Sequence, residues 1–159
     1  MGEENLLNKQ YRTISIISYA AATSILIYGL VAYFFTIHNT ASSNGGFENT
    51  ALLRTVFLLI SMGCFGMMRF IKAIFLNRQN LQGQTHDQIL AKMTTMTIIL
   101  LGFCETPALL GLVQSLLSRS FNEYYLFALI SAVLFMINFP KYDLWQRTLA
   151  ENAGVGKVV

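Results

Sequence analysis

Four long apolar stretches constrain what this chain of 159 residues can fold into. They cover approximately residues 14–37, 51–75, 94–117 and 124–139. A helix needs about 20 apolar residues to cross the roughly 30 Å hydrocarbon core of a bilayer, and helices buried in soluble domains rarely carry runs of this length. Charged residues make up 12% of the chain, about half the usual share in a soluble domain. The sequence therefore predicts an all-α membrane protein with four transmembrane helices, the connection 76–93 lying outside the membrane.

The basic residues lie mainly on one side of the predicted membrane. Two of them, Arg54 and Arg119, fall near the loops that follow the first and third spans. The other nine lie in the two tails or in the middle connection and its flanks: Lys9, Arg12, Arg69, Lys72, Arg78, Lys92, Lys141, Arg147 and Lys157. Because basic loops stay in the cytoplasm, we expect both termini and the middle connection to be cytoplasmic, an N-in/C-in orientation. The net charge of +3 is then an orientation signal and does not indicate a nucleic-acid partner.

The ends of the spans and the first apolar run refine this picture. Several aromatic residues fall where an interfacial belt is expected: Tyr11, Tyr124, Tyr125, Tyr142 and Trp145. A cleavable signal peptide is not expected, because the first apolar run is longer than a signal h-region. The outside loop around residues 38–50 has no Asn-x-Ser/Thr acceptor. These features fit a multi-pass protein of a bacterial inner membrane.

A faint internal repeat relates the two halves of the chain. A shift of 82 residues superposes the first span on the third, and a shift of 70 superposes the second on the fourth. Identical pairs include Thr13 with Thr95, Gly29 with Gly111, and Ser61 with Ser131. A unit of two spans returns to the side where it starts, so both copies have the same orientation. The repeat predicts two parallel-repeat hairpins, unlike the inverted repeats of many carriers. The charge bias likewise disfavours an antiparallel small multidrug exporter.

Glu105 is the one acidic residue that lies deep in a predicted span. A charge at that depth costs about 2.5–3.5 kcal/mol on insertion scales. We therefore expect the neutral carboxyl where Glu105 faces lipid or apolar protein. A carboxyl group whose charge changes with its surroundings can carry a proton, and with further oxygen ligands it can bind Na⁺. The alternative is structural: a permanently protonated Glu105 would be a fixed hydrogen-bond donor that joins helices.

The neighbours of Glu105 suit ion binding. Thr106 adds a hydroxyl, and Pro107 has no amide to bond the carbonyl of Phe103, which leaves a backbone oxygen near the acid. The repeat aligns Thr23 with Glu105, so one copy carries the acid. Small residues that would let a neighbouring helix approach complete the expected site: Gly102, Ala108 and Gly111.

The remaining residues indicate no other chemistry. The sequence contains no Ser-His-Asp set, phosphate loop or metal cluster, so no catalytic residue, metal or cofactor is expected. Cys64 and Cys104 fall in separate spans without Cys-x-x-Cys spacing, and we expect them in the core. Gly63 and Gly66, with Ser61, are expected to mark a close helix contact.

The segment Leu101-Gly-Phe-Cys-Glu-Thr-Pro-Ala-Leu-Leu-Gly-Leu-Val113 resembles the ion-carrying helix of the proteolipid c subunit of rotary (F-type and V-type) ATPases. In that family a membrane carboxylate is followed six residues later by Gly-Leu-Val, and Glu105 has this spacing to Gly111. The first span keeps Ile27-Tyr-Gly-Leu-Val31 without the acid. The motif lies here on the first and third spans and not on the second helix of each hairpin. In that family the carboxylate binds H⁺ or Na⁺ and the subunits form a rotating ring. The resemblance implies a distant or rearranged relative, with Glu105 at the position of the ion-binding carboxylate, more than a working ring subunit.

The sequence therefore favours a c-subunit-like, oligomeric membrane protein in which Glu105, supported by Thr106, binds H⁺ or Na⁺ reversibly for ion translocation. The alternative is a non-catalytic accessory subunit of a larger membrane complex, in which Glu105 makes a fixed hydrogen bond. In both cases the expected partners are membrane lipid and further copies or other membrane subunits, and no catalytic activity of its own is expected.

Overall fold

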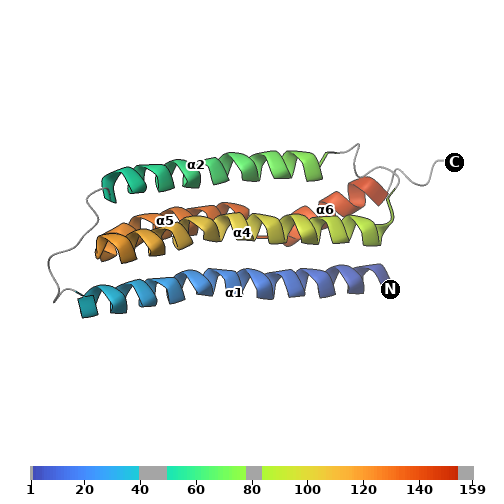
Figure 1. Cartoon of the computed structure of the whole chain (residues 1–159). Coiled ribbons are helices and arrows are strands. Elements are labelled where there is room, and N and C mark those ends of the chain that lie inside the picture. The colour runs from blue at the N-terminus through green and yellow to red at the C-terminus, as the bar shows by residue number, and fades with distance from the viewer. Residues whose placement is uncertain (1, 40–49, 78–83, 154–159) are drawn as a thin grey trace.

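The computed structural model of the chain describes residues 2–39, 50–77 and 84–153, which form helices and no strand (Figure 1). The helices are α1 (Gly2–Asn39), α2 (Thr50–Phe75), α4 (His86–Ser118), α5 (Phe121–Asn138) and α6 (Tyr142–Ala153). Four of them, α1, α2, α4 and α5, are long and apolar enough to cross a membrane. The prediction of an all-α, multi-pass membrane protein is thereby confirmed.

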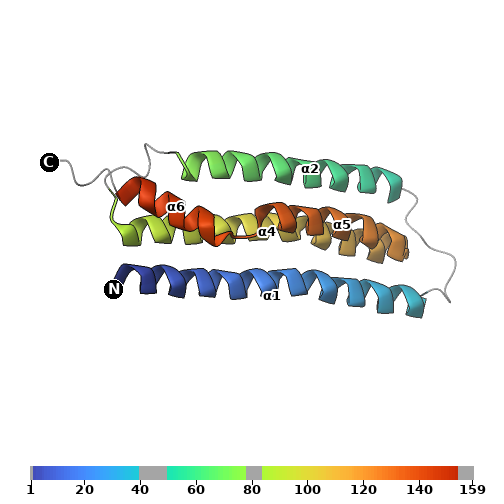
Figure 2. The same ribbon diagram turned by 180° about the vertical axis from the view of Figure 1, so that it is seen from behind.

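The four long helices alternate in direction, and α4 is the central one. Figure 1 shows α4 between α1 and α2, with the start of α1 and the end of α6 at the same end of the bundle. Figure 2, from behind, shows α5 lying along α4 on the opposite side. The main helix contacts agree with this view, because α4 packs against α5, α1 and α2, and α5 also packs against α1. The three other spanning helices are therefore held together chiefly through α4.

Local sequence signals fix where α4 and α5 begin and end. The side chain of Gln88 accepts a hydrogen bond from the backbone amide of Thr85 at 3.2 Å, which satisfies a donor at the start of α4. Arg119 adopts the left-handed conformation, with φ 54°, and ends the helix as such residues commonly do. Pro140 follows the end of α5, where its missing amide prevents the helix from continuing.

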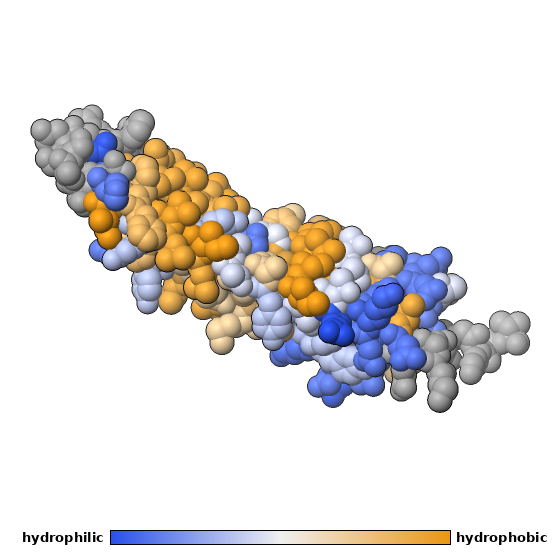
Figure 3. Space-filling view, turned by 90° about the horizontal axis from the view of Figure 1, so that it is seen from below, coloured by the Kyte–Doolittle hydropathy of each residue, from blue (hydrophilic) through white to orange (hydrophobic). Residues whose placement is uncertain are grey.

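At the end that holds the termini, the helices continue beyond the apolar spans. α1 begins at Gly2 and α4 at His86. α6 is an additional helix that was not predicted from the sequence. These segments enclose a separate small core of buried side chains: Leu7, Ile14, Ile89, Leu90, Met93 and Trp145. Figure 3 shows hydrophilic residues gathered on the surface of this end, whereas hydrophobic residues dominate the opposite half. The surface pattern is that of a polar end outside an apolar transmembrane part.

Two of the expected interfacial aromatics are core residues instead. Trp145 is 1% exposed in the small core, because Tyr142, Trp145 and Leu149 share the inward face of α6. Tyr124 is also buried, and its hydroxyl donates to the carbonyl oxygen of Ile25 on α1. Both side chains find hydrogen-bond or ring partners inside the protein, so neither is available as a lipid anchor.

The transmembrane part has a narrow core around α4. Its buried cluster comprises Met68, Met96, Leu100, Leu101, Cys104, Leu134 and Phe135. Cys64 and Cys104 are both free and buried, as expected. Large apolar side chains such as Leu26, Met62 and Met136 face outward and are 70%, 73% and 79% exposed. An apolar exterior of this kind is stable in lipid and not in water.

The glycines divide into those that carry a helix contact and those that do not. A Cβ atom at Gly111 would lie 2.5 Å from Cβ of Phe127, so α4 and α5 touch there at their backbones. Nothing lies within 4 Å of the equivalent position at Gly63, Gly66 or Gly102. The prediction of a close contact at Gly63 and Gly66 is therefore wrong within one chain. α2 packs on α4 through a different face, which carries Ser61, Cys64 and Met68.

Replacing Gly111 by alanine should separate α4 from α5. The added methyl group collides with Cβ of Phe127, which is fixed to its backbone, and overpacking of this kind costs about 1–3 kcal/mol. Thermal unfolding in detergent should show a lower midpoint for Gly111→Ala. Gly102→Ala, on the same helix but open to the surroundings, is the matched control and should unfold at or above the midpoint of the unmodified chain. Equal midpoints for the two variants would contradict the close contact.

Candidate functional site

Glu105 lies in the middle part of α4, half-buried, on the side that faces α1. The hydroxyl of Ser24 on α1 lies 2.9 Å from Oε1 of Glu105. The oxygen of Ser24 also lies 2.7 Å from the carbonyl oxygen of Ala21, one turn earlier in α1. A carboxyl group, a hydroxyl and a backbone carbonyl thus form a short polar chain between two transmembrane helices.

This polar chain constrains where protons can lie. A serine hydroxyl has one proton to donate and two lone pairs that accept. When Ser24 donates to Ala21, the contact with Glu105 is a hydrogen bond only if the carboxyl group itself supplies the proton. When Glu105 is ionised, the hydroxyl proton of Ser24 turns toward it. The same pair of side chains can therefore stabilise both the neutral and the charged carboxyl group.

Glu105 has no cationic partner within the described residues 2–39, 50–77 and 84–153. The acid that does form an ion pair is Glu123, whose Oε1 lies 3.3 Å from Nη1 of Arg54 near the end of the bundle away from the termini. The guanidinium group of Arg69 packs on the ring of Phe65 instead, 5.7 Å from its centroid. An ionised Glu105 would therefore have no countercharge among the described residues, and an uncompensated charge is costly in hydrocarbon.

The helix backbone around Glu105 is joined to α5 as well. Pro107 is buried and interrupts the hydrogen-bond pattern without ending α4, which continues to Ser118. One residue before Glu105, the carbonyl of Cys104 accepts a hydrogen bond from the hydroxyl of Ser131 on α5. Ser131 is fully buried. A serine from the neighbouring helix thus adds a hydrogen bond to the backbone in the turn that contains the proline.

The expected supporting residues occupy different positions. The hydroxyl of Thr106 donates to the carbonyl of Gly102 at 3.0 Å, within its own helix, and no contact joins it to the carboxyl group. Phe103, whose carbonyl lacks the amide of Pro107, is half-buried beside the α4 core. Gly111 is the close contact with Phe127 described above, whereas Gly102 faces outward.

Thr23, which the repeat aligns with Glu105, points away from it. Its hydroxyl donates to the carbonyl of Tyr19 at 2.8 Å and is exposed, while Ser24 makes the contact. Neighbouring residues on a helix differ in direction by about 100°, so Thr23 and Ser24 face different sides of α1. The repeat identified Thr23 as the counterpart of Glu105 in the first half and did not predict which residue of α1 contacts the acid. A polar residue on the inner face of the first span was the signal that could have identified Ser24.

Two further observations complete the description. The described part of the chain holds no group of three or more His, Cys, Asp or Glu side chains that could bind a metal ion. Comparison with protein-family models, with curated proteins and with solved structures gives no match for this chain.

Replacing Ser24 should change the carbonyl stretching band of protonated Glu105. In Ser24→Ala the carboxyl group loses its hydrogen-bond partner among the described residues, so the band should move to higher wavenumber in infrared spectra of the protein in lipid. Thr23→Ala removes a hydroxyl from the adjacent position and should leave the band in place. A Glu105→Gln sample assigns the band by its disappearance. Equal shifts in the two alanine variants would contradict the contact between Ser24 and Glu105.

Proposed function

We propose that this chain is a proton-binding membrane protein in which Glu105 takes up and releases a proton within the bilayer for ion translocation. The observation that carries the proposal is the placement of Ser24 between the carboxyl group of Glu105 and the carbonyl of Ala21. A permanently neutral carboxyl group needs only an acceptor. A hydroxyl that can turn from the carbonyl to the carboxylate also stabilises the state after proton release.

The two states differ in the position of one proton and in one rotation. In the loaded state, Glu105 donates its proton to the oxygen of Ser24, and Ser24 donates to Ala21. In the empty state, the proton has left Glu105, and Ser24 donates to the carboxylate. The charged state lacks a countercharge among residues 2–39, 50–77 and 84–153, so we expect release to need water or a further cation. A carboxyl group that is half-buried, and not fully enclosed, is accessible to such a partner.

The nearby oxygen atoms favour H⁺ over Na⁺ as the ion. One carboxyl group and one hydroxyl are enough to hold a proton, whereas a dehydrated cation needs several oxygen ligands at once. The hydroxyl of Thr106, which the sequence suggested as a further ligand, bonds its own helix. Sodium binding would require ligands from another chain.

The assembly that fits this proposal is an oligomer resembling the c-subunit ring. Each chain would contribute two hairpins in parallel repeat, with both termini in the cytoplasm of a bacterial cell. The common end of the two termini and the outward-facing Gly63, Gly66 and Gly102 support it, because small residues on a lipid-facing surface allow close packing of helices from another copy. The alternative is an accessory subunit of a larger membrane complex. In that case the hydrogen bond between Ser24 and Glu105 would only join α1 to α4.

Labelling with a hydrophobic carbodiimide tests the proton site. The reagent reacts with a protonated carboxyl group that it can reach from lipid, so modification of Glu105 in the protein reconstituted in lipid should fall as the pH rises. Mass spectrometry of the labelled peptide identifies the residue. Glu123→Gln, which removes an acid in an ion pair at the end of the bundle, should leave the labelling unchanged, and Glu105→Gln should abolish it.

Two other outcomes would change the conclusion. Protection of Glu105 by Na⁺ at constant pH would identify sodium as the ion. Labelling that does not vary with pH, or no labelling at any pH, would overturn the proposal of a titrating site and favour the accessory subunit.

Single cysteines at the two ends of the bundle test the orientation. The native cysteines are buried, so an impermeant maleimide should report on an introduced residue. Asn122→Cys, at the exposed start of α5, should be labelled in intact bacterial cells that express the chain. Gln146→Cys, exposed on α6, should be labelled only after lysis. The reverse pattern would contradict the N-in/C-in orientation.

A further inference from the structure

An apolar groove runs between α2 and α5 on the outer surface of the bundle. It has a volume of about 330 Å³, and its lining includes Met62 and Phe65 from α2 and Leu129, Val133 and Ile137 from α5. Leu129 and Ile137 are eight residues apart, so the groove extends about 12 Å along α5. We call this feature the α2–α5 groove. Its length, direction and lining suit an extended hydrocarbon chain that lies parallel to the helices.

Three basic residues lie at the end of the α2–α5 groove nearer the termini. Arg69 and Lys72 follow Phe65 by one and two turns of α2, and Lys141 follows Ile137 by four residues, just beyond α5. The guanidinium of Arg69 lies over Phe65, which lines the groove.

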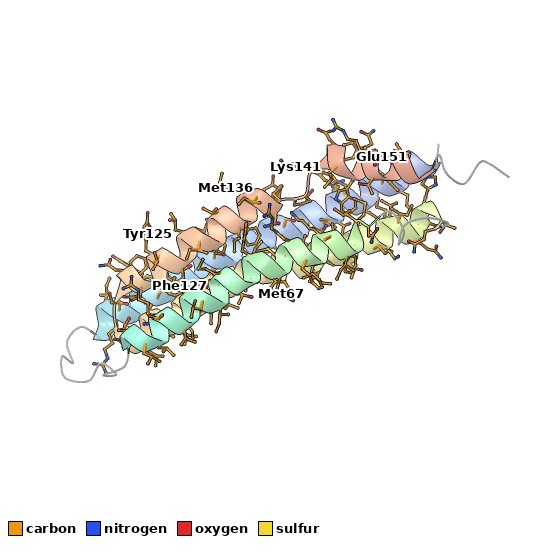
Figure 4. The ribbon with its side chains drawn as sticks, turned by 90° about the horizontal axis from the view of Figure 1, so that it is seen from above. Met67, Tyr125, Phe127, Met136, Lys141 and Glu151 are labelled. Carbon is orange, nitrogen blue, oxygen red and sulfur yellow. The ribbon has the colours of Figure 1, made fainter. Side chains whose placement is uncertain are left out.

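Figure 4 shows how these residues are arranged. Lys141 lies where the chain leaves α5 and enters α6, and Met67 lies on the side of α2 away from α5. Arg69 is two residues from Met67, a rotation of about 200°, and therefore projects from the side of α2 that faces α5. The three basic side chains thus lie around one end of the α2–α5 groove.

This cluster is electrostatically incomplete in one chain. None of its three side chains forms an ion pair with a residue of the described ranges. Lys72 is half-buried, so its charge is poorly hydrated, and an unpaired charge there is costly. An anion held at these basic side chains would compensate their charge. The anion must belong to a molecule that also fills an apolar groove.

We propose that the α2–α5 groove is a binding site for an anionic phospholipid, with an acyl chain along the groove and the phosphate group at Arg69, Lys72 and Lys141. Basic pockets between transmembrane helices on the cytoplasmic side recognise anionic head groups in this way. The site does not involve Glu105.

Lipid binding to the full chain in detergent, measured by native mass spectrometry, tests the site. The probes are phosphatidylglycerol and phosphatidylcholine with the same acyl chains. Phosphatidylglycerol should bind more tightly, and the Lys72→Gln/Lys141→Gln double variant should weaken its binding by roughly 30-fold while leaving phosphatidylcholine nearly unchanged. Arg12→Gln, an exposed basic residue on α1 at the same end of the bundle, is the control and should behave as the unmodified chain.

A second pair of variants tests the groove itself. Val133→Phe fills the α2–α5 groove from an exposed position and should weaken phosphatidylglycerol binding, whereas Met67→Phe, on the other side of α2, should not. Unchanged helix content in circular dichroism excludes unfolding as the cause. Equal affinity for the two lipids, or equal losses in the double variant and Arg12→Gln, would overturn the proposal. If the chain forms a dimer and Val133→Phe dissociates it, a second copy occupies the α2–α5 groove, and this outcome would also overturn the proposal.

Discussion

The absence of water from the hydrocarbon core is the constraint on which this structure depends, because polar groups there must find partners within the protein. Several Ser and Thr hydroxyls of the long helices meet it by bonding the carbonyl one turn earlier in their own helix. Ser18, Thr23, Thr36, Thr55, Ser61, Thr97 and Thr106 all do so. Among the hydroxyls that bond a different helix, three lie near the candidate site: Ser24 with Glu105, Ser131 with Cys104, and Tyr124 with Ile25.

The convergence of these three bonds explains how the candidate site is held. Ser24 and Ile25 are consecutive on α1, and Cys104 and Glu105 are consecutive on α4, so α1, α4 and α5 are joined around the carboxyl group. Side chains fixed in this way keep Ser24 within reach of Glu105, which a site on loops would not. α2 takes no part in these three hydrogen bonds. Near the site it contacts α4 through apolar side chains and sulfur atoms, and Sγ of Cys104 lies 3.7 Å from Sδ of Met68.

Much of the fold was predictable from the sequence, and part of the site was. The four spans and Glu105 follow from the length of the apolar runs and from the cost of a buried charge, which act locally and need no tertiary information. The supporting hydroxyl was expected from Thr106 and comes from Ser24, because the sequence does not determine which face of α1 meets α4. Close helix contacts were expected at Gly63, Gly66, Gly102 and Gly111, and of these Gly111 makes one, since a small residue permits a contact and does not select the helix that makes it.

The sequence by itself determined that the chain forms four membrane-spanning helices with a single acid in their midst, because transfer of side chains from water to lipid depends on each segment alone. Only the tertiary structure decided that α4 is central, that α6 and Trp145 close a small core outside the spans, and that Ser24 adjoins the acid. It also formed an apolar groove between α2 and α5. These features depend on the rotation of each helix about its axis, which packing between helices sets and the apolar surface of each helix leaves undetermined.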